Sequence, residues 1–244
     1  MSSIFEMRRN AIDNNTSPTT HPVWLFAALG IWLVILALAM WRYHGPQLVT
    51  ATDPQNSMVY SGANAEKILF ELVGNGVPHP AGSKDNVRVR ELILGKVRGL
   101  GFDVYQQKTE SHIHLAPANP EVELTNILFR LEGTNSNDSP AVMLVAHYDS
   151  SRNGPGAGDD GVGVASVLEI ARMLKSQPAL RNDVIFLLTD GEEYGLLGAA
   201  RFCEEHAWAK QVRVCINLEA RGTSGPSLMF QTSEGNEWLW PITT

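Results

Sequence analysis

Imidazole and carboxylate groups recur in four short clusters between residues 146 and 221, and three of the four follow an apolar stretch. The clusters are His147-Tyr148-Asp149, Gly158-Asp159-Asp160-Gly161, Asp190-Gly191-Glu192-Glu193 and Asn217-Leu218-Glu219. Imidazole and carboxylate together are the ligands of catalytic zinc, and histidine suits zinc better than it suits calcium or magnesium. The four clusters therefore predict a metal site, with zinc as the leading metal.

His147 is the predicted imidazole ligand, and Asp149 is its predicted partner. Asp149 lies two residues further along an extended segment, so its side chain points the same way and can take the proton on one ring nitrogen. That contact leaves the other nitrogen with a lone pair for metal. We therefore expect Asp149 to orient His147 rather than to bind metal. A hydrogen-bonded histidine at the end of a strand is the competing interpretation.

Asp159 and Asp160 lie in a glycine-rich loop that opens a predicted helix. A carboxylate in such a loop can bridge two cations while backbone amides offset its charge. Simple capping of the helix is the alternative, and it suits Asp160 better than Asp159. Capping and ligation are compatible within one loop.

Glu192 and Glu193 offer adjacent carboxylates at a predicted strand-to-helix turn. One of them can bind metal while its neighbour takes a proton from water that zinc has acidified to a pKa of about 7. The alternative is a pair of acidic side chains that offset a helix dipole. Glu219 ends the next predicted strand, where a solvated glutamate would be unremarkable in isolation.

The elements that must position these groups alternate between strand and helix. Strands are predicted at 102–108, 124–131, 141–146, 183–189, 212–218 and 228–231, and helices at 65–73, 87–100, 162–174 and 196–206. This alternation predicts an α/β fold, a three-layer sandwich with a mostly parallel central sheet. Ligands bind such sheets at the carboxyl ends of the strands, which places His147, Asp190 and Glu219 on one edge.

The stretch from Val23 to Trp41 contains no charged residue and is long enough, at roughly 28 Å, to span the hydrocarbon core of a bilayer. Trp24 and Trp41 lie at its ends and Arg42 follows, as expected for residues at a membrane interface. We predict a tail at 1–22, a transmembrane helix at 23–41, a linker at 42–60 and a soluble domain at 61–244. A buried core helix and a cleaved signal peptide are the alternatives.

Composition fits one globular domain plus an appendage: 244 residues, 44% of them hydrophobic, with 21 Gly and 13 Pro. The 26 acidic residues outnumber the 19 basic ones, and this excess falls after Ser61, which disfavours nucleic acid as a partner. Arg8 and Arg9 favour an N-terminus on the inner side of a membrane, so the soluble domain would be periplasmic, lumenal or extracellular. Two cysteines provide no disulfide framework.

The four clusters resemble the motifs of metallopeptidase family 28, the zinc aminopeptidase and exopeptidase-like family. That pattern is His-x-Asp, then Gly-x-x-Asp-Asp-x-x-Gly, then Glu-Glu, then an Asp or Glu that ends a later strand. The resemblance covers roughly residues 65–239, with the motifs in the family's order. The last motif ends in glutamate, and an apolar segment lies at 23–41. In both features the sequence is similar to the membrane-bound branch of the family, typified by the endoplasmic-reticulum metallopeptidases.

The resemblance implies a role for each ligand. Carried over by position, His147, Asp159 and Glu219 hold one zinc, while Asp159 also bridges to a second zinc held by Glu193 and a later histidine. Glu192 would be the general base and acid. The resemblance thus implies two Zn²⁺ ions per complete active site.

The resemblance also implies a cis peptide bond between Asp159 and Asp160. The later histidine has no match up to Thr244, so we expect the chain to be part of a longer peptidase with that ligand encoded further on. Tyr148, Tyr194 and Arg221 flank the ligands and are candidates either for lining a substrate pocket or for packing.

These implications lead to one expected function and two alternatives. The expected function is a membrane-anchored aminopeptidase that hydrolyses the N-terminal bond of peptides with a free N-terminus through a metal-activated water. The first alternative is a single-zinc acyltransferase similar to glutaminyl cyclases, against which the intact Asp160 counts. The second is a non-catalytic ectodomain of the same fold, whose members lose ligands that this chain retains.

Overall fold

The computed structural model describes residues 23–44, 57–112, 121–135, 140–220, 229, 231–236 and 238. The chain divides into two compact units, residues 1–48 and 49–244. The first unit contains one described helix, α2 (Val23–His44), and the second contains the sheet and the remaining described helices.

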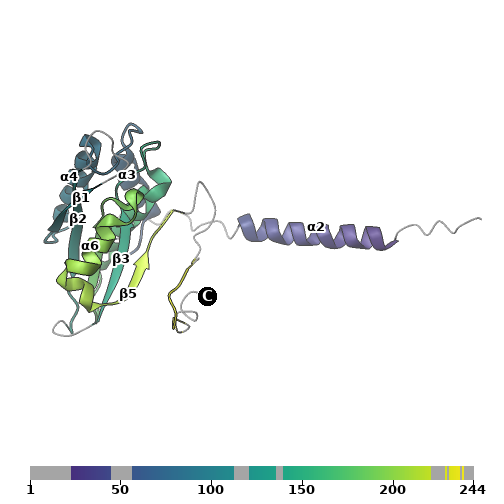
Figure 1. Ribbon diagram of the computed structural model, residues 1–244. Helices are drawn as coiled ribbons and strands as arrows, with labels where there is room; N and C mark the ends of the chain where they lie inside the picture. The colour runs from purple at the N-terminus through teal and green to yellow at the C-terminus, as the bar shows by residue number, and fades with distance from the viewer. Residues whose placement is uncertain are drawn as a thin grey trace, which may run out of the picture. The chain divides into compact units, whose positions relative to one another are not determined.

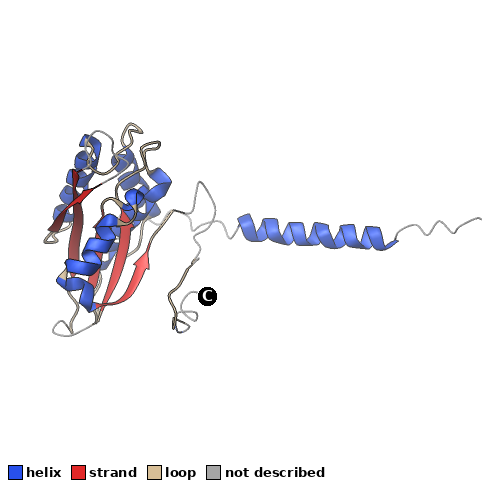
Figure 2. Cartoon of the chain, in the orientation of Figure 1, coloured by secondary structure: helices blue, strands red, loops and turns tan. Residues whose placement is uncertain are grey.

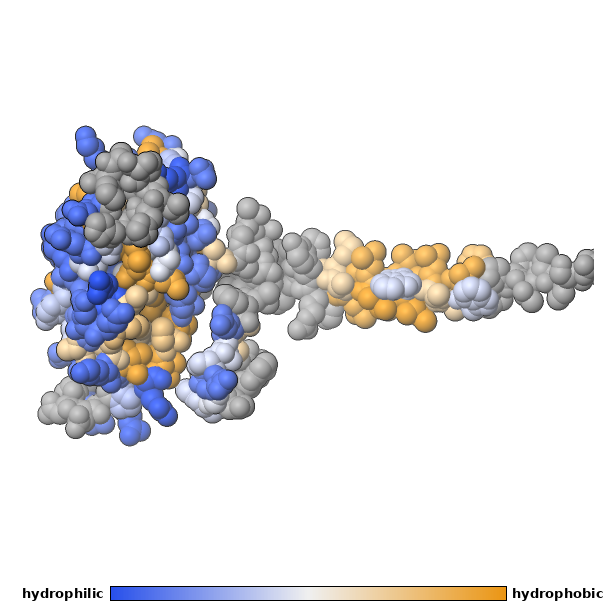
Figure 3. All heavy atoms as spheres, viewed as in Figure 1, coloured by the Kyte–Doolittle hydropathy of each residue, from blue (hydrophilic) through white to orange (hydrophobic). Residues whose placement is uncertain are grey.

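The helix predicted at 23–41 is present as α2 and extends to His44. Its described side chains, residues 24–40, are all exposed, and most of that surface is apolar (Figure 3). Among the described residues, no helix meets the combined length and hydropathy of a membrane span. The helical assignment is confirmed, and the transmembrane assignment stays a prediction.

The described part of the second unit is built on a five-stranded mixed sheet with the order β1-β2-β4-β3-β5 (Figures 1 and 2). The strands are β1 (Tyr105–His112), β2 (Glu121–Leu131), β3 (Ala141–His147), β4 (Val184–Thr189) and β5 (Val212–Asn217). β3 is parallel to both β4 and β5, whereas β2 is antiparallel to β1 and β4. The predicted parallel centre is present, and the antiparallel strands make the sheet mixed.

Helices cover both faces of the sheet, as the predicted three-layer sandwich requires. They are α3 (Gly62–Val73), α4 (Lys84–Gly99), α5 (Val162–Lys175) and α6 (Leu197–Glu205). The first three bury apolar side chains against one face, where the rings of Phe129 and Phe186 stack at 4.6 Å between centroids. α6 packs Phe202 against the other face, beside Met143 and Val145 (Figure 1).

Local sequence explains where the first two helices of the second unit begin. Ser61 and Ser83 are extended N-cap residues whose hydroxyls accept hydrogen bonds from backbone N–H groups three residues on. Each cap satisfies a donor that the first helical turn leaves without a partner. In α4, Asp85 in the first turn and two basic residues in the last turn also oppose the helix dipole favourably.

Three strand predictions differ from the structure by more than one residue. The strand predicted at 124–131 begins three residues earlier, at Glu121. The strand predicted at 102–108 begins three residues later, because Phe102 packs into the core beside Phe129 before the chain reaches the edge of β2. The strand predicted at 228–231 lies partly outside the described residues. Met229 and Gln231, which are described, have no regular secondary structure.

The connections after the two parallel strands β3 and β4 pass to opposite faces of the sheet. The chain leaves β3 through α5 on one face, and it leaves β4 through α6 on the opposite face. The loops after these two neighbouring strands therefore diverge, and such a switch point is where open α/β sheets bind ligands. His147 is the last residue of β3.

Candidate metal centre

The two ring nitrogens of His147 face different partners. Nδ1 lies 2.9 Å from the main-chain oxygen of Asp149, so this nitrogen carries the proton and donates it to the carbonyl. Nε2 lies 2.9 Å from Oδ1 of Asp159 and 3.8 Å from a carboxylate oxygen of both Glu192 and Glu219. Nε2 of the buried imidazole thus faces three carboxylates from three separate segments.

The donor set fits a divalent metal ion. One donor atom each from His147, Asp159 and Glu219 can be chosen so that all lie within 4.8 Å of one another. Three protein ligands of nitrogen and oxygen type are what a catalytic zinc uses, because it keeps a further position for water or substrate. These residues come from the end of β3, the turn before α5 and the segment after β5, which the sheet brings to one edge.

Asp159 is held by a tight turn between residues 157 and 161. Gly156 before this turn has a φ of 66°, and a Cβ there would lie 2.8 Å from Cβ of Ser150 and 2.9 Å from the carbonyl oxygen of Asp159. Glycine is therefore required both by conformation and by space. The peptide bond between Asp159 and Asp160 is cis, as the resemblance implied.

Asp160 caps α5, as the sequence favoured. Its Oδ1 accepts a hydrogen bond of 3.1 Å from the backbone N–H of Gly163, and its carboxyl group is buried. Burial raises the pKa of Asp160 to about 8, with the charge of Glu219 adding to the effect and that of His147 opposing it. The other oxygen has no hydrogen-bond partner among the described residues.

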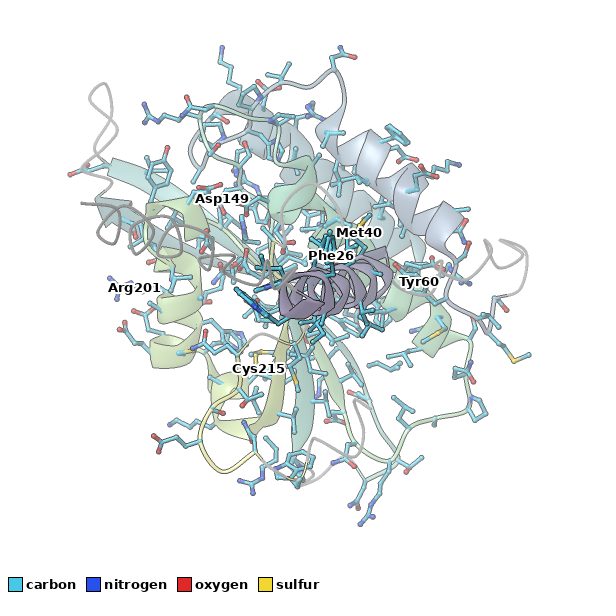
Figure 4. The ribbon with its side chains drawn as sticks, turned by 90° about the vertical axis from the view of Figure 1, so that its right-hand side faces the viewer. Phe26, Met40, Tyr60, Asp149, Arg201 and Cys215 are labelled. Atoms are coloured by element: carbon cyan, nitrogen blue, oxygen red, sulfur yellow. The ribbon has the colours of Figure 1, made fainter. Side chains whose placement is uncertain are left out.

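Asp149 has a different main contact from the one predicted. Its Oδ1 lies 3.5 Å from Nδ1 of His147, farther than the main-chain oxygen of Asp149, which lies at 2.9 Å and receives the imidazole proton. The carboxylate instead accepts backbone N–H groups of Glu192 at 3.0 Å and Glu193 at 3.2 Å. Asp149 lies at the end of the sheet toward which the parallel strands run (Figure 4). It anchors the turn that carries both glutamates.

Glycine makes that turn possible. Gly191 follows β4 by two residues and has a φ of 74°, in the left-handed region, and a Cβ there would lie 2.9 Å from a methyl carbon of Leu124. The half-buried side chains of Glu192 and Glu193 follow it. Of the two, Glu192 reaches His147, whereas Glu193 is outside the group of three clustered donors.

Negative charge is concentrated around the imidazole. Burial alone would lower the pKa of His147, but the nearby carboxylates of Asp149, Asp160 and Glu192 raise it to about 10. Burial likewise raises the pKa of Glu192, and neighbouring carboxylates add to that effect. Burial and the charge of Asp159 raise the pKa of Glu193. A divalent cation would neutralise the charge that these groups impose on one another.

A buried hydrogen-bond network beneath the site was not predicted. Asp190 accepts hydrogen bonds from the side chain of Asn86, the backbone of Thr125 and the hydroxyl of Tyr148, each at 3.0 Å. Tyr148 is buried and belongs to the core rather than to a pocket wall. Its partners lie 23 and 42 residues away, so no local pattern indicated them.

Two other candidate pocket residues have different outcomes. The hydroxyl of Tyr194 accepts a hydrogen bond of 3.0 Å from Nε of Arg152, which places both side chains near the turn that carries Glu193. Arg221 lies outside the described residues.

Sequence comparison assigns the domain. A family model described as peptidase family M28 matches residues 126–241. The human endoplasmic reticulum metallopeptidase 1 is 42% identical over 228 residues, which cover 87% of this chain and 25% of that protein. A vacuolar membrane protease of Eremothecium gossypii is 32% identical over 223 residues, 83% of this chain and 21% of that protein. The chain spans about a quarter of the length of the curated relatives it matches.

Solved structures share the fold. A zinc aminopeptidase from Bacillus subtilis has a TM-score of 0.58 at 18% identity, covering 68% of this chain and 71% of that one. A glutaminyl cyclase from Porphyromonas gingivalis also has a TM-score of 0.58, at 23% identity, covering 66% of this chain and 59% of that one. The chain therefore shares the fold of these two proteins, and by its sequence it carries a peptidase M28 domain.

Proposed function

We propose that this chain is the catalytic part of a membrane-anchored zinc aminopeptidase, which hydrolyses the N-terminal bond of peptides with a free N-terminus. The observation that carries the proposal is the convergence of Asp159, Glu192 and Glu219 on Nε2 of His147. Three of these four residues would hold a zinc ion, and the fourth would remain for proton transfer. Zinc bound there polarises a carbonyl and lowers the pKa of water to about 7.

Glu192 has the position of a general base. Its carboxylate is half-buried, and burial raises its pKa, so that it takes up a proton more readily than an exposed glutamate. The two N–H bonds to Asp149 fix the backbone of Glu192 and Glu193. The base is therefore positioned before substrate arrives, which reduces the ordering needed in the transition state.

Glu193 is the proposed ligand of a second zinc ion, which it would share with Asp159. Support comes from the charge of Asp159, which with burial raises the pKa of Glu193. The three clustered donors of His147, Asp159 and Glu219 would account for one zinc ion. The count of two therefore rests on Glu193 and on the family resemblance, and zinc stoichiometry in the purified protein tests it directly.

Anchoring by α2 is proposed from its surface and from the relatives. Large apolar side chains such as Trp24, Phe26 and Trp32 are at least two-thirds exposed in this helix, and water is an unfavourable environment for such a surface (Figure 3). The names of similar proteins specify an endoplasmic reticulum or a vacuolar membrane. We accordingly propose that residues 23–41 lie in a membrane, with the peptidase domain on its lumenal or outer side.

Substitution of Glu192 by Gln tests the proposed base. The amide cannot take up the proton, so turnover of leucine p-nitroanilide should fall by about 10²- to 10⁴-fold while bound zinc remains. The control is Glu204→Gln on α6, whose carboxylate is largely exposed and should leave turnover unchanged. Zinc content is measured on the same samples. Full activity of the Glu192→Gln protein would show that another group moves the proton.

The same preparation separates the two catalytic alternatives. An aminopeptidase releases p-nitroaniline from leucine p-nitroanilide but leaves the N-acetylated compound intact. A glutaminyl cyclase instead releases ammonia from a peptide with N-terminal glutamine and binds one zinc ion. A domain that neither binds zinc nor turns over either substrate would be the non-catalytic alternative.

A further inference from the structure

The carboxylate of Asp190 is fully buried, and three donors converge on it. Oδ1 accepts from the side-chain amide of Asn86 on α4, and Oδ2 accepts from the backbone N–H of Thr125 on β2. The hydroxyl of Tyr148 shares its proton between Oδ2 at 3.0 Å and the carbonyl oxygen of Thr125 at 2.7 Å. Only a carboxylate can accept from all three, because an amide would turn a donor toward at least one of them. A buried polar group of this kind is stable only while its partners are in place.

The backbone of Asp190 is fixed as firmly as its side chain. Its N–H donates to Oδ1 of Asn126 at 3.1 Å, and its carbonyl accepts from the N–H of Gly198 at 3.1 Å. A Cβ on Gly198 would lie 2.3 Å from that carbonyl oxygen, so the start of α6 packs directly against Asp190. The residue therefore links α4, β2 and α6 at one point.

Asp190 also lies between the two halves of the proposed site. Its partner Tyr148 directly follows His147, and Asp190 itself precedes Glu192 by two residues. The hydrogen bond between Tyr148 and Asp190 thus joins the segment that carries the imidazole to the turn that carries the base. The distance of 3.8 Å between Nε2 of His147 and Glu192 depends on how these segments are held together.

We propose that Asp190 is a positioning residue, which sets the placement of Glu192 relative to His147 through its bond to Tyr148. This role rests on the proposed zinc peptidase function. Asp190 acts through the residues on either side of the site and touches neither metal nor substrate. Partners of this kind at metal sites change metal affinity or activity by about 10- to 100-fold when they are removed.

The chain provides a matched control on the same strand. Asp183 lies directly before β4 and Asp190 lies directly after it. Both carboxyl groups are buried. Asp183 accepts from the guanidinium of Arg130 and from the backbone N–H of Gly133, at the end of the sheet away from the site. Asp183→Asn and Asp190→Asn therefore make the same substitution at similar burial, and Asp183→Asn additionally breaks the ion pair with Arg130, so it is the more demanding control for lost stability.

Both variants of the full chain are compared with the wild type by thermal unfolding, by kcat and KM for leucine p-nitroanilide, and by the visible absorption of the Co²⁺-substituted protein. Asp190→Asn should lower kcat by about 10- to 100-fold with a smaller change in KM, and should shift the Co²⁺ bands. Asp183→Asn should lower the unfolding temperature alone. If both variants lose only stability, Asp190 has no positioning role.

Two further variants test the same role if the Asp190→Asn protein folds poorly. Tyr148→Phe removes only the hydroxyl and should lower kcat in the same direction as Asp190→Asn. The double variant Asn86→Asp with Asp190→Asn reverses one hydrogen bond while keeping a carboxylate in the network, and should recover part of the lost kcat. If kcat is lost in neither Asp190→Asn nor Tyr148→Phe, the proposal is overturned. A wild-type protein without zinc binding or turnover would overturn the proposed function itself, and the positioning role with it.

Discussion

The imidazole of His147 shows how backbone contacts prepare a ligand. Its Nδ1 donates to the carbonyl oxygen of Asp149, which leaves Nε2 with a lone pair among three carboxylates. A carbonyl can only accept, so it determines the tautomer without adding another full charge to an acidic site. The single residue most closely tied to metal binding is therefore His147.

Replacement of His147 by Ala should reduce zinc affinity by more than the roughly 10- to 100-fold that removal of an outer partner costs, because a direct ligand is lost. Competition with a chromogenic chelator measures this. The control is His206→Ala, since His206 packs between Phe202 and Trp208 and contacts none of the proposed ligands. Equal zinc affinity of the two variants would exclude His147 as a ligand.

Asp149 supports the glutamates through their backbone. Substitution of Asp149 by Ala would leave the N–H groups of Glu192 and Glu193 without their acceptor, at a cost of about 1–3 kcal/mol in the free energy of unfolding. Turnover should fall as well, because the turn that carries the base is released. Urea unfolding and kcat are measured alongside Asp103→Ala, an exposed position where the free energy should change by about 0.5 kcal/mol or less. An unchanged stability of Asp149→Ala would contradict this role.

At the scale of elements, the start of α5 is built around Asp160. A Cβ on Gly163 would lie 2.3 Å and 2.4 Å from the two carboxylate oxygens of Asp160, so the glycine is required by the cap itself. The same capping turn presents Asp159 to His147. Helix capping and the proposed metal binding thus fall to consecutive residues of one turn.

Two glycine substitutions should have opposite effects on stability. Gly163→Ala should lower the free energy of unfolding by about 1–3 kcal/mol, because the methyl group displaces the Asp160 carboxylate. Gly95→Ala in the middle of α4, where a Cβ meets nothing within 4 Å, should raise it by up to about 1 kcal/mol. Urea unfolding measures both. Stabilisation by Gly163→Ala would mean that the capping carboxylate is free to move.

At the scale of the whole molecule, an apolar helix and an acidic metal site belong to separate units of the chain. The described surface of α2 is predominantly apolar, whereas the faces of the sheet are covered by amphipathic helices (Figure 3). We therefore attribute localisation to the first unit and chemistry to the second. The two can be changed independently.

Two arginines in α2 should release the chain from membranes. A charged residue at the centre of a membrane helix costs about 2.5–3.5 kcal/mol, so Leu33→Arg with Leu36→Arg should move the full chain from the carbonate-resistant pellet to the supernatant. The control is Phe70→Arg with Val87→Arg, exposed apolar positions in the second unit, which should leave the distribution unchanged. Retention of both proteins in the pellet would show that α2 is not the anchor.

The sequence alone predicted the larger features because they depend on local patterns. Buried strands such as β4 are continuous apolar runs, and three of the four acidic or imidazole clusters follow directly at the ends of strands. The start of β1 was misplaced because Phe102 is apolar but packs in the core before any pairing begins. Periodicity does not distinguish these two ways of burying a side chain.

The ligand candidates and the α/β alternation were determined by the sequence, because residue type and spacing along the chain express them directly. Only the tertiary structure decided which partners meet. The carboxylate of Asp149 accepts hydrogen bonds from two backbone amides that lie 43 and 44 residues further along the sequence, rather than from the imidazole. The partners of Asp190 are up to 104 residues away in the sequence. A buried acceptor needs a hydrogen-bond donor. Which donor lies within reach depends on the packing of α4, β2 and β3 rather than on neighbours in the chain.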